Sequence, residues 1–141
     1  MKTNRKGFTL IELLAVIVIL AVIALIATPL IMGTITKAKK NSAVDSAYGY
    51  MKAVEQAIGE HQVDDPTGAF DVANKTFETS DNGATITTDS YADLEITVNY
   101  KGSQPTDGGT LTYDENGRVT SGKLEIGGYT VTITNDKATV N

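Results

Sequence analysis

The sequence predicts an α+β protein in which a long N-terminal helix packs on a small antiparallel β-sheet. Three observations lead to this fold class. Residues 13–36 contain no charged side chain, the apolar residues that follow recur with helical spacing, and the C-terminal part alternates apolar with polar residues. Strict alternation gives a sheet one buried face and one wet face, which is typical of antiparallel strands.

The apolar block is long enough to span a membrane, and we expect residues 8–36 to form a transmembrane helix. Crossing roughly 30 Å of hydrocarbon takes about 20 apolar residues. A cleaved secretory signal would instead show an apolar region of about 7–15 residues before an A-x-A site, and the block contains no A-x-A. The basic residues on its two sides nearly balance, so charge alone leaves the orientation open. These residues are Lys2, Arg5 and Lys6 before the block and Lys37, Lys39 and Lys40 after it.

Residues 37–60 are expected to continue this helix as an amphipathic segment. Apolar side chains recur there in steps of three and four, at Val44, Ala47, Tyr48, Met51, Val54 and Ile58. Such spacing predicts one apolar helix face, which would cover the buried face of the sheet. We expect one helix from about Phe8 to Ile58, with Gly59 as its stop and a turn at 64–68.

Residues 61–141 are expected to form the antiparallel β head domain. Alternation predicts strands at 94–100 and 129–135, with shorter strands at 110–113 and 123–126. Tight turns are expected at 114–117 and 126–129, and a final hairpin within 135–140. Residues 61–90 are expected to be mainly loop, with one strand at 84–88.

The composition argues against several classes of function. The chain has no cysteine, which excludes disulfides and thiolate metal sites, and its net charge of −5 disfavours binding to a nucleic-acid backbone.

The candidate sites for ligands or catalysis are few. His61 is the only histidine and is a candidate ligand by itself. The acid pairs at 64–65 and 114–115 fit no EF-hand loop, although calcium binding there stays open. We regard the glycosylation sequon at Asn74 as incidental. No phosphate-binding loop or activated nucleophile is evident, so we expect neither an enzyme nor a cofactor.

The stretch KGFTLIE, residues 6–12, resembles the N-terminus of type IV prepilins and pseudopilins, with basic residues before it and an apolar helix after it. In that family a dedicated membrane peptidase cuts after the glycine and methylates the new N-terminus. The resemblance implies that residues 1–7 are a cleaved leader and that the cut falls between Gly7 and Phe8. It further implies that Phe8 is N-methylated and that Glu12 is the family's filament-assembly acid.

Glu12 is costly in hydrocarbon unless a cation accompanies it. We expect it to pair with the Phe8 amine of a neighbouring subunit. Two alternatives are a pair with the amine of its own chain, since residues 8 and 12 are one helical turn apart, and a single acid facing water. Pro29 resembles a helix-disrupting proline of many pilins, and with Gly33 it is a candidate hinge; a static kink is the alternative.

The resemblance implies a structural subunit of a type IV pilus-like filament, with an α+β pilin-like fold. The implied partners are copies of itself, other pilins, a prepilin peptidase and methylase, an assembly ATPase and a membrane platform protein. The precursor would be a single-pass membrane protein with its N-terminus in the cytoplasm, and the assembled filament would be extracellular. The alternatives are a pseudopilin of a type II secretion or DNA-uptake system and a membrane-anchored binding module that never polymerises.

Overall fold

The computed structural model describes residues 7–65, 67 and 70–141, apart from the side chains of residues 92 and 93. The basic part of the expected leader, residues 1–6, lies outside the described residues, as do positions 66 and 68 of the expected turn at 64–68. The chain divides into two compact units, Met1–Ala38 and Lys39–Asn141.

A single helix, α1 (Leu10–Asp64), covers both of the expected helical segments except residues 8 and 9, because it begins at Leu10 rather than at Phe8. The expected stop at Gly59 is wrong, because the helix continues to Asp64. A glycine inside a helix costs only about 1 kcal/mol relative to alanine. Packing on both sides of Gly59 outweighs that cost: Ile58 is buried, and the His61 ring meets the Phe70 ring edge-on at 4.8 Å between centroids. His61 therefore lies in the last turn of the helix rather than beyond it.

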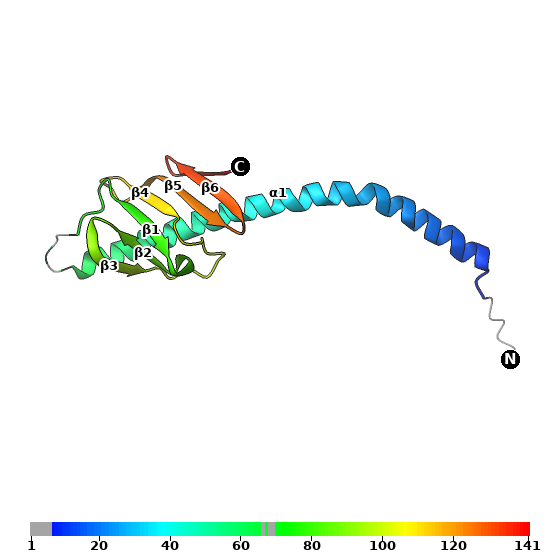
Figure 1. Ribbon diagram of the computed structural model, residues 1–141, viewed down its shortest axis with the longest axis horizontal. Coiled ribbons are helices and arrows are strands. Elements are labelled where there is room, and N and C mark those ends of the chain that lie inside the picture. The colour runs from blue at the N-terminus through cyan, green and yellow to red at the C-terminus, as the bar shows by residue number, and fades with distance from the viewer. Residues whose placement is uncertain (1–6, 66, 68–69) are drawn as a thin grey trace. The chain divides into compact units, whose positions relative to one another are not determined.

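Seven strands form one antiparallel sheet in the order β3-β2-β1-β4-β5-β6-β7 (Figure 1). The first three strands form a meander, and β4 returns through a long connection to pair with β1, which is a Greek-key arrangement. The strands are β1 (Thr76–Ser80), β2 (Thr85–Thr88), β3 (Tyr91–Thr97), β4 (Thr110–Tyr113), β5 (Val119–Ile126), β6 (Tyr129–Thr134) and β7 (Lys137–Val140).

The core of the second unit lies between one face of the sheet and the part of α1 that belongs to this unit, which runs along the sheet in Figure 1. The helix contributes Ala43, Ala47, Tyr50, Met51, Val54, Ala57 and Ile58. The strands contribute alternate residues, as in β6, where Val131 and Ile133 are buried and Thr132 is exposed. The predicted helix-on-sheet packing is thus confirmed, although Val44 and Tyr48 are only partly buried.

The hairpins of the C-terminal half form where they were predicted. The β5–β6 turn places Gly127 and Gly128 at φ of 60° and 79°, and the β6–β7 turn places Asn135 and Asp136 at 49° and 62°. Positive φ at both central residues matches the right-handed twist of the adjoining strands. One strand was missed, because β1 lies in the segment that was expected to be mainly loop. Two other strands have different bounds: the strand expected at 94–100 runs from Tyr91 to Thr97, and the one expected at 123–126 begins at Val119.

Candidate processing and assembly site

The scissile bond implied by the sequence lies outside the helix. Residues 7–9 have no regular secondary structure, and α1 begins at Leu10. Phe8 is 91% exposed, and a Cβ added at Gly7 would meet no described atom within 4 Å. Among the described residues, nothing therefore crowds Gly7 beside this bond.

Thr9 is the N-cap of α1. Its carbonyl accepts the first helical hydrogen bond, from the Leu13 amide at 3.2 Å. Its hydroxyl accepts a hydrogen bond from the Glu12 amide at 3.3 Å, which satisfies one of the amides that a helix start leaves without a partner.

The Glu12 side chain in turn accepts hydrogen bonds from Thr9. Its Oε2 accepts hydrogen bonds from the Thr9 amide and the Thr9 hydroxyl, both at 2.8 Å. A threonine cap with a glutamate three residues later is a capping box. The capping box was not among the three partners considered for Glu12 from the sequence, and those three stay predictions because the α-amine of Phe8 forms only on cleavage. The T-x-x-E pattern before an apolar run could have revealed it, and Thr9 is the site residue that the sequence reasoning missed.

The capping box uses only one of the two oxygens of the Glu12 carboxylate. Both hydrogen bonds go to Oε2, whereas Oε1 accepts none from the residues that the structure describes. Phe8 and Glu12 are not hydrogen-bonded to each other within that same part of the chain. An ionised carboxylate can accept about four hydrogen bonds, so the capped acid keeps capacity for a further donor.

The residues of α1 that follow present apolar surface on every side. α1 is long and apolar enough to cross a membrane, and its most apolar window has no buried residue in the described chain. Leu10, Leu25 and Leu30 are 84%, 78% and 76% exposed. Helices that are apolar all round are normally buried in lipid or protein.

The candidate hinge residues lie inside this apolar stretch, and α1 passes through Pro29 without a break. Pro29 has no amide hydrogen to donate to the Leu25 carbonyl. Thr28 and Thr34 bond their hydroxyls back to the carbonyls of Ala24 and Leu30, at 2.7 Å and 3.2 Å. Such back-bonding often bends helices. The stretch thus combines several features that weaken a helix, and hinge motion at Pro29 and Gly33 stays a prediction.

No group of three or more His, Cys, Asp or Glu in the described residues could hold a metal ion. Two of the acids considered from the sequence have structural partners instead. Asp114 accepts hydrogen bonds from the amides of Arg118 and Asn116, at 2.9 Å and 2.8 Å, and the bond from Arg118 is the main cause of its lowered pKa. Asp65 accepts a hydrogen bond from the Phe70 amide at 2.9 Å. Both acids stabilise the loops in which they lie.

Comparison with known proteins gives a family match at the N-terminal end of the chain. Residues 2–28 match the family described as the prokaryotic N-terminal methylation motif. The match includes Gly7, Phe8, Thr9 and Glu12, and it ends just before Pro29. No curated protein and no solved structure matches the chain significantly. The chain therefore carries at residues 2–28 the N-terminal methylation motif, the class III signal peptide of type IV pilins and pseudopilins, and this motif runs into the long helix of an α+β pilin-like fold.

Proposed function

We propose that this protein is a structural subunit of a type IV pilus-like filament. In this proposal a prepilin peptidase cuts between Gly7 and Phe8, the new terminus at Phe8 is N-methylated, and the chain is packed into a polymer through its apolar helix. The motif at residues 2–28 and the long apolar helix support a membrane-anchored precursor of this kind.

The observation that carries the proposal is the unpartnered apolar surface of α1. Soluble monomers rarely expose contiguous apolar patches larger than a few hundred Å², yet side chains of α1 from Leu10 to Ile35 are exposed on all sides. Lipid would cover this surface before assembly. In a filament, the same helices of neighbouring subunits would replace the lipid. Lipid tails are as apolar as leucine, so close packing rather than the hydrophobic effect would favour that exchange.

Glu12 would set the register of that packing. Cleavage leaves Thr9 in place, so the capping box can persist in the mature chain. Cleavage also creates an α-amine at Phe8 with an ordinary pKa near 8, largely protonated at neutral pH. Oε1 of Glu12 has no partner in the described chain and could accept this amine from an incoming subunit. An acid and a cation that share the apolar layer offset each other's cost of burial there.

Two measurements test the proposal in the native host. Mass spectrometry of the mature chain is expected to find N-methyl-phenylalanine, from Phe8, as its first residue. Glu12→Ala is expected to insert into the membrane and to be cleaved, but to be missing from filaments that wild-type subunits form. Glu115→Ala, which removes the same charge from an exposed turn of the head, serves as the control. An intact Met1 in the mature chain would overturn the processing step, and normal incorporation of Glu12→Ala would overturn the role of the acid.

A further inference from the structure

One edge of the sheet, the outer side of β7, is bonded to a side chain of α1 within the second unit. β7 is the last strand of the sheet and pairs with β6 on one side. Edge strands present backbone amides and carbonyls to which a strand of another molecule can pair. The Tyr48 hydroxyl accepts a hydrogen bond from the Ala138 amide of β7 at 2.9 Å. Tyr48 therefore occupies a backbone group through which the sheet could be extended.

The register of the β6–β7 hairpin shows which backbone groups of β7 face outward. Ala138 lies opposite Ile133, and Val140 lies opposite Val131. In an antiparallel pair, residues that bond across the ladder alternate with residues whose amide and carbonyl point away from it. The bond to Tyr48 places Ala138 among the outward-pointing residues. Val140, two residues further on, therefore points outward as well.

This edge is complementary to itself. When β7 of a second copy is placed antiparallel to it, about a two-fold axis through Thr139, Ala138 of each chain lies opposite Val140 of the other. Both residues point outward, so each of these pairs can exchange backbone hydrogen bonds. Lys137 then lies opposite Asn141, so the pairing brings no like charges face to face. Half of the new bonds need the Ala138 amide.

We infer that Tyr48 closes the β7 edge against pairing with β7 of a second copy of this chain. Its hydroxyl oxygen takes the place that the Val140 carbonyl of the incoming strand would need. The Tyr48 ring is packed against the hydrophobic core, so the closure is part of the folded head domain. Copies that are crowded together then meet through other surfaces. The inference concerns the second unit and depends on neither cleavage nor polymerisation, so it fails independently of the proposed function.

Amide hydrogen exchange of the full-length chain in dodecyl maltoside micelles, measured by NMR, tests the contact. Tyr48→Phe keeps the ring and removes the hydroxyl. The Ala138 amide is therefore expected to exchange about fivefold faster, as the loss of one hydrogen bond implies.

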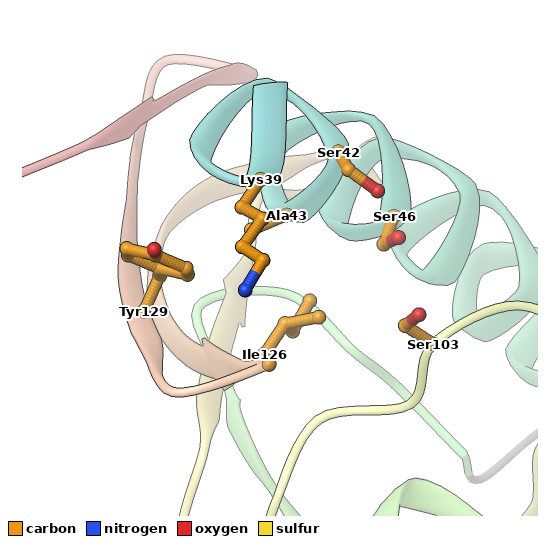
Figure 2. Close-up of a pocket in the computed structure, with 8 residues that line it drawn as sticks. Lys39, Ser42, Ala43, Ser46, Ser103, Ile126 and Tyr129 are labelled. Carbon is orange, nitrogen blue, oxygen red and sulfur yellow. The ribbon is translucent and has the colours of Figure 1, made fainter. Parts of the chain in front are cut away.

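Tyr129→Phe is the matched control for this measurement. Tyr129 is also partly buried against the core, and its hydroxyl makes no hydrogen bond to the other described residues. Figure 2 shows it away from β7, beside a pocket of about 210 Å³ between α1 and the β5–β6 hairpin. This control should leave the exchange of the Ala138 amide unchanged. An unchanged rate in Tyr48→Phe, or an equal rise in both variants, would overturn the contact.

Analytical ultracentrifugation of the same preparations tests the closure. Tyr48→Leu keeps an apolar side chain against the core but has no hydroxyl for the edge, so it should strengthen self-association at least about tenfold over wild type. Adding Val140→Pro should reverse this gain, because proline removes an outward amide and blocks strand addition at an edge. Association through the apolar helix is common to all variants and cancels in the comparison.

Two results of this second experiment would overturn the inference. Self-association of Tyr48→Leu no stronger than that of wild type, with the head domain folded, would show that the edge needs no closure. Association that Val140→Pro leaves unchanged would show that another surface is responsible. The exchange result in Tyr48→Phe stands even where leucine unfolds the head domain.

Discussion

Two buried tyrosines provide a matched test of how the head domain is held together. The Tyr50 hydroxyl donates a hydrogen bond to the Gly83 carbonyl at 2.9 Å, whereas the Tyr113 hydroxyl is buried without a partner in the described chain. Each ring also meets another ring edge-on: Tyr50 meets Tyr100 at 5.8 Å and Tyr113 meets Phe77 at 5.6 Å. Phenylalanine at either position would keep the ring contact and remove only the hydroxyl.

The two substitutions should therefore have different effects on the free energy of unfolding. Tyr50→Phe removes a buried hydrogen bond and takes a donor from a buried carbonyl, so we expect a loss of about 1–2 kcal/mol. Tyr113→Phe removes a hydroxyl that is desolvated without compensation, so we expect no loss and a gain of up to about 1 kcal/mol. The pKa of Tyr113 is raised above its ordinary value, first by burial and then by the charge of Glu55, which agrees with an unfavourable environment for the hydroxyl.

Urea denaturation of the full chain in dodecyl maltoside, followed by tyrosine fluorescence, measures both effects. The chain has six tyrosines and no tryptophan, so each variant keeps most of the signal. With a slope of about 1–1.5 kcal/mol/M, the midpoint should fall by about 1 M in Tyr50→Phe and stay level or rise in Tyr113→Phe. Equal destabilisation by the two substitutions would refute the reasoning, because it would mean that the Tyr113 hydroxyl has a favourable partner.

Three further predictions concern the sheet, the helix face and the cap. A Cβ on Gly122 would lie 2.5 Å from a backbone oxygen of β4, so Gly122→Ala should lower the free energy of unfolding by about 1–3 kcal/mol, whereas Ser121→Ala at an exposed position of β5 should change it little. Burial is the main cause of the raised pKa of Glu55, so its neutral form favours the folded state. Glu55→Gln should therefore raise the urea midpoint at pH 7, and this gain should shrink as the pH falls through the raised pKa toward the ordinary value of 4.5. Thr9→Val removes the capping hydroxyl and should speed amide hydrogen exchange in the first turn of α1 about fivefold, whereas Thr9→Ser should not.

Most of the C-terminal sheet could be predicted because its strands alternate cleanly. In β6, Val131 and Ile133 face the core and Thr132 between them faces water. β1 gives a much weaker signal, because its two buried side chains are Phe77 and Thr79. Thr79 is buried for a reason that the sequence does not reveal: its hydroxyl bonds to the Thr106 carbonyl and the Gly109 amide, at 2.7 Å and 2.8 Å, and so holds the connection between β3 and β4.

The strand order could not be predicted, because alternation reports which face of a strand is buried and not which strand lies beside it. The pairing of β1 with β4 depends on the long connection that Thr79 holds in place. The end of α1 was missed for a related reason. Gly59 is a plausible stop in sequence, but the contact between His61 and Phe70 that supports the last turn is tertiary.

For the candidate processing site, the residue types could be predicted from the sequence, but the contacts of Glu12 could not. Its residue types were recognisable from seven consecutive letters, and residues 2–28 match the methylation motif. The partner of Glu12 in the isolated chain was not predicted, because attention went to the charge of the acid and not to its place in the T-x-x-E cap. The cap changes the account of assembly, since an incoming amine would bind a carboxylate that already has a fixed orientation.

The central claim is that Glu12 receives its positive partner from another molecule. A cryo-electron microscopy map of the native filament, at a resolution that shows side chains, tests it most directly. Our account predicts the Phe8 amine of one subunit within about 3 Å of Glu12 Oε1 of the next, a hydrogen-bonded distance for a charged pair. A map in which only Thr9 and Phe8 of the same chain contact Glu12, or in which the carboxylate faces solvent, would contradict that account.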